Sequence, residues 1–141
     1  QGKPGKAIAV LEKAISLAPD SARFHLRLGQ AYAKTNRDDQ ATAAFAKALE
    51  LEPHWTKAQF ELAMIHVRAL RPTQAVPLFE QVLQTDPHHV HAHFGLGLAS
   101  IDLENYPKAE AAFAQVLQLQ PNYPRGRRFL QLVRSKMAPQ K

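Results

Sequence analysis

A run of histidines is the feature of this sequence that most resembles a reactive or metal-binding site. Within the segment 86–93, His89 and His93 are four residues apart, a spacing that places two imidazoles on one face of a helix. A metal site needs three or four convergent ligands, yet the chain has no cysteine and no carboxylate at a matching spacing. The run also straddles the expected start of a helix. We therefore interpret it as a surface histidine run and predict no metal and no other cofactor.

Motifs for nucleophilic catalysis and phosphate binding are missing. The sequence contains no thiol and no Gly-x-Ser-x-Gly elbow, so it offers no activated nucleophile. Its six glycines form no phosphate-binding loop, and Gly95 and Gly97 fall inside an expected helix, where close packing explains them. Neighbouring carboxylates such as Asp38 and Asp39 fall at an expected turn. We predict that the chain has no catalytic residue and is not an enzyme.

The net charge of +6 is concentrated at the C-terminal end. Residues 1–110 contain 12 Lys and Arg and all 12 Asp and Glu, so their charges cancel. Residues 111–141 contain no acid and six bases, which are Arg125, Arg127, Arg128, Arg134, Lys136 and Lys141. A nucleic-acid surface would need a basic stripe interleaved with aromatic side chains, and only Phe129 lies among these bases. We interpret the cluster as a solvated end helix and do not expect nucleic acid as a partner.

The composition is that of a soluble globular chain, with 45% hydrophobic and 21% charged residues. No apolar run reaches the length needed to span a bilayer, and no apolar stretch follows the N-terminal residues QGKPGK, so neither membrane insertion nor a signal peptide is expected. The missing initiator methionine suggests a piece of a longer protein. The Ala- and Gln-rich, cysteine-free composition favours a bacterial source. It leaves the compartment, cytoplasm or periplasm, open.

A period of 34 residues organises the chain. Pro19, Pro53, Pro87 and Pro121 recur at that interval, and aligning the sequence on them brings other columns into register. An alanine stands twelve residues before each proline, and a leucine or phenylalanine stands eight residues before it. An alanine or valine stands five residues before each proline. A Leu-Gly or Leu-Ala pair stands earlier in each full unit. These columns are Ala7, Ala41, Ala75 and Ala109; Leu11, Phe45, Phe79 and Phe113; Ala14, Ala48, Val82 and Val116; and Leu28-Gly29, Leu62-Ala63 and Leu96-Gly97.

Each column has a physical reason. Apolar residues recur at spacings of three and four, so each unit is expected to hold two amphipathic helices, joined near 35–39, 70–73 and 104–107. The small residue after Leu allows the helices to approach closely, and Phe fills the space beside it. Proline ends each second helix because it cannot continue one. The residues after the prolines, Asp20, His54, His88 and Asn122, are expected to open the next helix. Pro77 predicts a kink or a late start in its helix.

The order Leu-Gly-x-x-Tyr, Ala-x-x-x-Phe and Pro on this period resembles the tetratricopeptide repeat (TPR). The resemblance implies an all-α, right-handed superhelical solenoid of antiparallel helix pairs, with about eight helices in a single array over residues 1–141. It divides the chain into the second helix of a truncated repeat (1–19), full repeats at 22–55, 56–89 and 90–123, and a C-terminal capping helix at 124–137. Departures from the family pattern are His25, Gln59 and His93 in place of an aromatic residue and Leu70 in place of a turn glycine.

The resemblance also implies a concave groove, lined by the first helix of every repeat, as the partner-binding surface. The candidate groove residues are Arg23, Leu26, Gln30, Lys57, Phe60, Met64, Val67, Arg68, His91, Phe94, Leu98, Ile101 and Arg125. The Lys and Asn pattern with which some members hold a terminal carboxylate is absent, since its positions hold residues such as Leu26, Gln30 and Glu61. The asparagine ladder of other members is absent too.

The groove candidates combine an apolar floor with a basic edge, which is typical of an interaction site for a hydrophobic or amphipathic segment. We therefore predict a protein–protein interaction scaffold whose partner is a protein or peptide. Periodicity alone leaves open that some of these residues are buried between helices. The alternative function is a structural spacer or oligomerisation segment of a larger protein. It would use the apolar face near Ile8, Leu11 and Ile15, which is expected to be uncovered and could form a homodimer.

Overall fold

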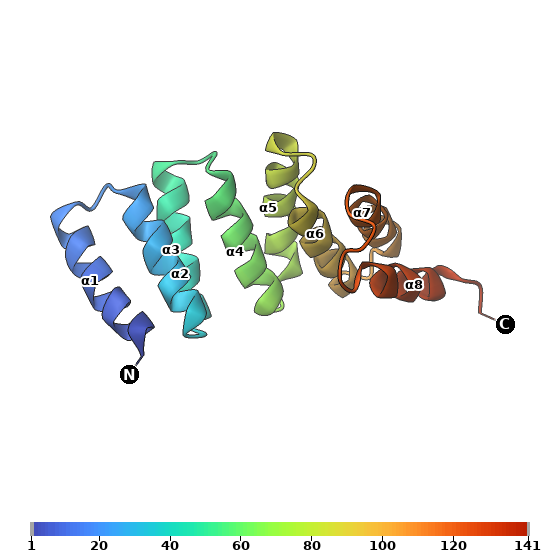
Figure 1. Cartoon of the computed structure of the whole chain (residues 1–141), viewed down its shortest axis with the longest axis horizontal. Helices are drawn as coiled ribbons and strands as arrows, with labels where there is room; N and C mark the ends of the chain where they lie inside the picture. Colours follow the sequence, from blue (N-terminus) through green and yellow to red (C-terminus); the bar gives the residue numbers. More distant parts are fainter. Residues whose placement is uncertain (1, 141) are drawn as a thin grey trace. The chain divides into compact units, whose positions relative to one another are not determined.

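The computed structural model describes residues 2–140, which form helices and turns and contain no strand (Figure 1). The eight helices in this range are α1 (Lys3–Leu17), α2 (Ala22–Lys34), α3 (Asp38–Leu51), α4 (Thr56–Arg68), α5 (Pro72–Thr85), α6 (Val90–Asp102), α7 (Tyr106–Leu119) and α8 (Gly126–Met137). The predicted all-α architecture with about eight helices is confirmed. Residue 1, where the predicted array begins, and Lys141 of the basic cluster lie outside the described residues.

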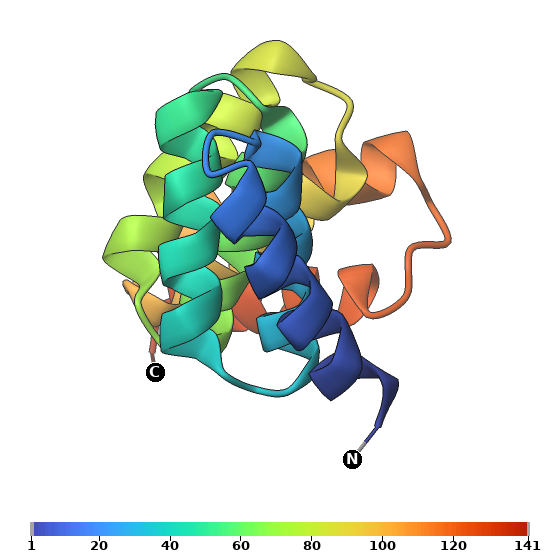
Figure 2. The same cartoon turned by 90° about the vertical axis from the view of Figure 1, so that its left-hand side faces the viewer.

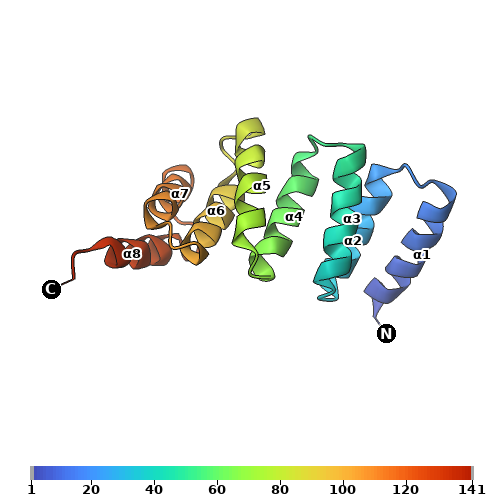
Figure 3. The ribbon, with the colours of Figure 1, turned by 180° about the vertical axis from the view of Figure 1, so that it is seen from behind.

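The chain forms two compact units, Gln1–Ile65 and His66–Lys141. In the first unit α1 packs on α2 and α2 on α3. Figure 1 shows α2 in front of α3 and antiparallel to it, and the view from behind shows α3 in front (Figure 3). Seen from the N-terminal side, α1 is nearest to the viewer (Figure 2). In the second unit α5 packs on α6, α6 on α7 and α7 on α8. Each unit is thus built from helices that pack on their neighbours in the chain.

The turns inside the helix pairs lie where the sequence predicts them. Helix α2 ends at Lys34 and α3 begins at Asp38, and the turns after α4 and α6 are equally short. Each turn contains one residue in the left-handed region, with φ of 57° at Asn36, 56° at Leu70 and 56° at Glu104. Only glycine and, less readily, asparagine adopt this conformation without strain. Leu70 therefore holds a strained backbone where the family pattern has glycine.

The prolines end the second helices as expected, but the residues after them do not open the next ones. The helices α1, α3, α5 and α7 each end two residues before a proline of the 34-residue series. The N-terminal caps of α2 and α6 lie one residue later than predicted: Ser21 Oγ accepts from the N–H of Phe24, and His89 Nδ1 accepts from the N–H of Ala92 at 3.0 Å. His88 instead belongs to the turn, where its N–H donates to Asp86. The turn needs one residue more than the prediction allowed. At α8 the cap residue is Arg125, three residues after Asn122, and its side chain makes no capping hydrogen bond.

Helix α5 does not start late at Pro77. It begins at Pro72 and runs through Pro77 to Thr85. Proline is favourable in the first turn, where a missing N–H removes no helical hydrogen bond, so Pro72 sets the start. Pro77 lies inside α5 and is exposed to solvent.

A seam of small and aromatic side chains fills the core of both units. In the first unit, a β-carbon on Gly29 would lie 2.6 Å from the ring of Phe45. In the second unit, a β-carbon on Gly97 would lie 2.6 Å from the ring of Phe113. The ring of Phe79 occupies the corresponding space at Gly95. All three phenylalanines are completely buried. The predicted close packing of glycine against phenylalanine is therefore present in both units.

The apolar face of α1 is covered more than the sequence suggested. Ile8 is buried, and Leu11 and Ile15 are half-buried. The expectation of an uncovered face is wrong at Ile8, whereas Leu11 and Ile15 remain partly exposed although α2 packs on α1. The large apolar side chains that α1 does expose are Val10, at 67%, and Leu17, at 81%.

Candidate protein-interaction surfaces

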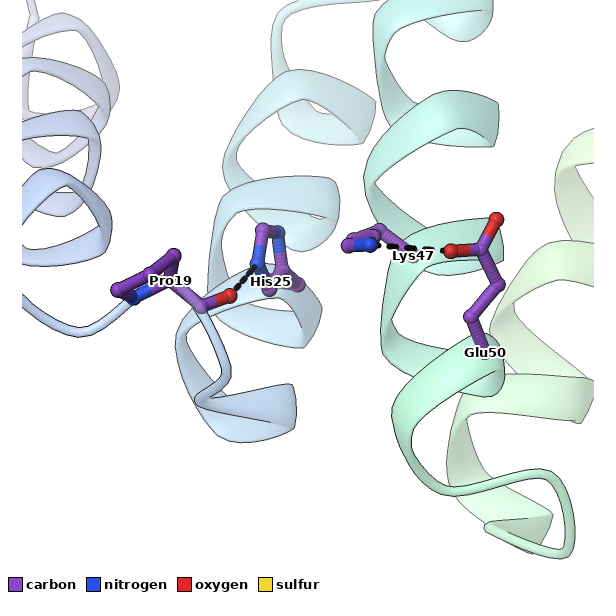
Figure 4. Close-up of polar contacts among 4 residues, drawn as sticks. All are labelled: Pro19, His25, Lys47 and Glu50. Carbon is purple, nitrogen blue, oxygen red and sulfur yellow. Dashed lines mark hydrogen bonds and ion pairs between the residues drawn. The ribbon is translucent and has the colours of Figure 1, made fainter.

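A column of polar residues anchors the start of the first helices, which carry the candidate groove residues. The side chains of His25 and His93 each donate a ring N–H to the carbonyl of the proline six residues earlier, Pro19 and Pro87, at 2.8 Å. Gln59 donates from Nε2 to Pro53 at 3.0 Å. A carbonyl oxygen is only an acceptor, so the imidazole nitrogen that faces it must carry the proton. Figure 4 shows this contact at His25 and also the exposed ion pair between Lys47 and Glu50.

These bonds explain why polar residues replace the aromatic side chain of the family pattern. Each one ties the first turn of a helix to the proline in the turn that follows the preceding helix. The first helices are thereby fixed relative to the second helices before them. The polar column is a positioning device, and it lies next to the surfaces that the sequence predicts for binding.

In the first unit, one of the predicted groove residues is buried. Leu26 is only 3% exposed, so it belongs to the core and cannot contact a partner as a floor residue. Arg23 and Lys57 are exposed, whereas Phe60 and Met64 are half-buried. Periodicity had left open that some groove candidates are buried between helices, because an apolar position on a helix can face either the core or a partner-binding surface.

A hydrogen bond aligns α2 with α4 inside this unit. Gln30 Nε2 donates to Glu61 Oε1 at 3.0 Å. On α4, Phe60 is adjacent to Glu61, and Met64 lies one turn beyond Phe60, so the two apolar side chains share a face. The bond therefore holds the Gln30 side of α2 beside the helix that carries Phe60 and Met64.

A cleft of about 480 Å³ lies between α1 and α2 in the same unit. Its lining consists of Lys3, Pro4, Ala7, Leu11, Arg27, Gln30, Ala31 and Lys34. The floor is apolar and three cations stand around it. Sequence reasoning placed Gln30 on the groove side but did not predict a cleft there, because the cleft depends on how α1 and α2 pack.

In the second unit, Phe94 is also buried, at 5% exposure, so it is not a free floor residue either. Val67, Leu98 and Ile101 are half-buried, and Arg68, His91 and Arg125 are exposed. The burial of Phe94 has a clear cause. Its ring packs against an aromatic cluster whose other members are Phe113, Tyr123 and Phe129, with ring centroids 5.0–5.5 Å away.

Three groove candidates of this unit, His91, Phe94 and Arg125, come together around Tyr123. The Nδ1 atom of His91 and the hydroxyl of Tyr123 are 2.8 Å apart, and the guanidinium carbon of Arg125 lies 5.6 Å from the centroid of the Phe94 ring. Burial raises the pKa of Tyr123, and the charge of Arg125 opposes that shift. The phenol is therefore neutral at physiological pH.

Tyr123 was missed as a candidate residue, although the sequence carries a signal for it. It stands two residues after Pro121, and the same position two periods earlier holds Trp55. An aromatic residue at a repeated position outside the helices indicates a packing role at the start of the next helix. The contact with His91, 32 residues earlier, depends on the pairing of helices and is not visible in the spacing.

The histidine run has structural partners. His89 caps α6, His91 bonds to Tyr123, and His93 bonds to the carbonyl of Pro87. Within residues 2–140, no three His, Asp or Glu side chains are grouped so that they could hold a metal ion.

The comparisons with known proteins identify the family. The family model described as "Cytochrome c-type biogenesis protein H TPR domain" matches residues 11–125. The chain belongs to this TPR family. A search among curated proteins gave no match.

Solved structures of MamA have the same fold as this TPR domain. A "MamA RS-1 ArsTM double mutant" superposes with a TM-score of 0.94 at 22% identity, covering 96% of this chain and 76% of that one. "MamA 41-end from Desulfovibrio magneticus RS-1" gives 0.93 at 22% identity, with 96% and 77% covered. A structure of MamA MSR-1 gives 0.88 at 26% identity, with 96% and 78% covered. These similarities support the helical-repeat fold.

Family and fold together establish the general role of the chain. It is a TPR-type scaffold for protein interaction, and scaffolds of this family are generally non-catalytic. Among the helices of residues 2–140, none combines the length and apolar character needed to cross a bilayer.

Proposed function

We propose that the TPR domain binds an amphipathic helical segment of a partner protein against the face of α4 that carries Phe60 and Met64. The observation that supports this is the partial exposure of two large apolar side chains one helical turn apart. A pair at this spacing matches the i, i+4 apolar stripe of an amphipathic helix. Exposed Arg23 and Lys57 would favour acidic residues beside that stripe.

The family name suggests where such a partner belongs. The matching family is named for cytochrome c-type biogenesis, so we extend that process to this chain as part of the proposal. The partner segment would then come from a protein that takes part in making c-type cytochromes. An extended TPR surface suits this role because it binds a segment without needing a catalytic residue.

The test measures capture of immobilised peptides by the whole chain. The probes are amphipathic helical peptides with acidic or basic polar faces and the polypeptide of a c-type cytochrome without haem. The double variant Phe60→Gln and Met64→Gln should lose at least about ten-fold in affinity for the acidic-faced peptide, because it removes the apolar contact and leaves the charge unchanged. Its circular-dichroism spectrum should stay helical.

The matched control is Val10→Gln with Leu17→Gln, which changes two exposed apolar residues on α1. This control should bind as the wild type does. Equal binding by both double variants would refute α4 as the site. Capture of only the basic-faced peptide would refute the expected charge of the partner.

The second candidate function is self-association through α1. The observation that favours it is the exposure of Val10 and Leu17, which are two helical turns apart. Sedimentation at increasing protein concentration tests this function. A dimer that disappears in the Val10→Gln and Leu17→Gln variant supports it, and a monomer at every concentration counts against it.

A further inference from the structure

A basic cavity in the second unit has no role in the peptide-binding surface proposed above. It has a volume of about 330 Å³ and is lined by Pro121, Asn122, Tyr123, Arg125, Arg127 and Arg128. We call it the arginine pocket. It lies where the chain passes from α7 into α8. Its three arginines belong to the basic cluster that sequence reasoning assigned to a solvated end helix.

The positive charge of the arginine pocket is not neutralised by the chain itself. No acidic residue occurs after Glu110. Glu110 is already occupied, because Arg134 Nε donates to it at 2.7 Å. Across residues 2–140, the structure gives no ion pair to Arg125, Arg127 or Arg128. Three guanidinium groups around one cavity repel each other, and an anion between them would relieve this repulsion.

Two walls of the pocket are held in place by the core. Arg125 lies over the ring of Phe94, which is fixed by its contacts with Phe113 and Phe129. The hydroxyl of Tyr123 is held by His91. A guanidinium group that stacks on a buried ring loses less freedom when it binds a ligand than a free surface arginine does. The arginine pocket is therefore preorganised for binding at Arg125 and Tyr123.

The geometry favours a carboxylate over a nucleic acid. Arginine binds planar carboxylates with two parallel hydrogen bonds. A nucleic acid would need accessible aromatic faces for stacking along a basic stripe. Here Phe113 and Phe129 stack on each other at 5.4 Å, and Phe94 is buried, so these rings offer no free face for a base.

We propose that the arginine pocket binds the carboxylates of an acidic peptide segment, with Arg125, Arg127 and Arg128 as the binding residues. The proposal does not depend on the binding of a partner at Phe60 and Met64, because none of the residues or probes is shared.

The test is fluorescence anisotropy with the whole chain and a labelled octaglutamate peptide, with octaglutamine as the neutral probe. The triple variant Arg125→Gln, Arg127→Gln, Arg128→Gln should bind octaglutamate at least about ten-fold more weakly than the wild type. The control triple variant Lys6→Gln, Lys13→Gln, Lys47→Gln removes the same charge from exposed sites in the first unit and should stay within about two-fold. Octaglutamine should not bind.

A further variant separates binding from folding. Arg125 has φ of 64°, which glycine adopts without strain, so Arg125→Gly should remain folded. It should still weaken octaglutamate binding by about three-fold or more, since it removes one of the three guanidinium groups.

Three results would overturn the proposal. The first is an equal loss in both triple variants, which would mean that net charge alone attracts the peptide. The second is tighter binding of a single-stranded RNA octamer than of octaglutamate, with the same sensitivity to the arginine variants. The third is binding to phosphatidylglycerol vesicles in the absence of peptide binding.

Discussion

The ring of Phe113 fills the space that a side chain on Gly97 would need. A β-carbon at Gly97 would lie 2.6 Å from Cζ of Phe113, well inside van der Waals contact. The ring has no room to move, because Phe94 and Phe129 pack against it with centroids 5.5 and 5.4 Å away. The close approach of α6 and α7 therefore depends on the absence of one methyl group.

We expect Gly97→Ala to destabilise the chain by about 1–3 kcal/mol, the usual cost of overpacking a well-packed core. Urea unfolding measures this cost. The matched control is Gly5→Ala in α1, where a β-carbon meets nothing within 4 Å. That substitution should stabilise the chain by about 0.5–1 kcal/mol, because alanine is the better helix former. If both variants gained stability, the contact with Phe113 would not be rigid.

Removing an aromatic ring from the seam should cost more. Phe45 is completely buried against Gly29, so Phe45→Ala leaves a cavity and should lower the free energy of unfolding by about 3–5 kcal/mol. Val10→Ala, at a position that is 67% exposed, should change it by less than about 0.5 kcal/mol. A loss below about 1 kcal/mol at Phe45 would show that the site can collapse and that the ring is not essential to the core.

Leu70 offers a stabilising substitution. It has φ of 56° and is 76% exposed, so its side chain contributes little packing while its backbone is strained. Leu70→Gly should raise the free energy of unfolding by about 1 kcal/mol, because the left-handed conformation costs roughly that much for a residue with a β-carbon. The control is Leu103→Gly, since Leu103 is also exposed but has φ of −89°. Leu103→Gly should not raise the free energy of unfolding, because no backbone strain is relieved there. A loss of stability in Leu70→Gly would mean that the side chain packs better than its exposure indicates.

His66 should make stability depend on pH. Its side chain is buried, and this desolvation, helped by the charge of Arg71, lowers its pKa in the folded state. Below the ordinary histidine pKa of about 6.5 the unfolded chain therefore binds a proton that the folded chain resists. Neutral His66 therefore contributes its full share to the free energy of unfolding above about pH 6.5. This share is lost as the pH falls from there through the lowered pKa of the folded state.

The measurement for His66 is the urea midpoint between about pH 7.5 and pH 5.5. The wild type should lose more stability over this range than His66→Phe, which has no titrating group at the position. Parallel curves for the two proteins would show that His66 does not resist protonation in the folded state.

The sequence alone determined the repeat, the positions of the turns and the glycine–phenylalanine seam. These features follow from local causes. Spacings of three and four define a helix face, proline cannot continue a helix, and a small residue opposite Phe45 or Phe113 is required for two helices to approach. Each also recurs every 34 residues, so one repeat supports the interpretation of the next. The caps of α2 and α6 were misplaced by one residue, because the turn after each proline needs one residue more before the helix begins.

Only the tertiary structure decided which candidate binding residues are accessible. Leu26 and Phe94 have the same periodicity as Phe60, yet the first two are buried and the third is half-buried. An apolar position on a helix says that the side chain prefers to leave water, but not whether its own chain or a partner covers it. The contacts of Tyr123 join the turn before α8 to helix α6, whereas the arginine pocket forms within residues 121–128, where the fold of the turn into α8 groups the side chains.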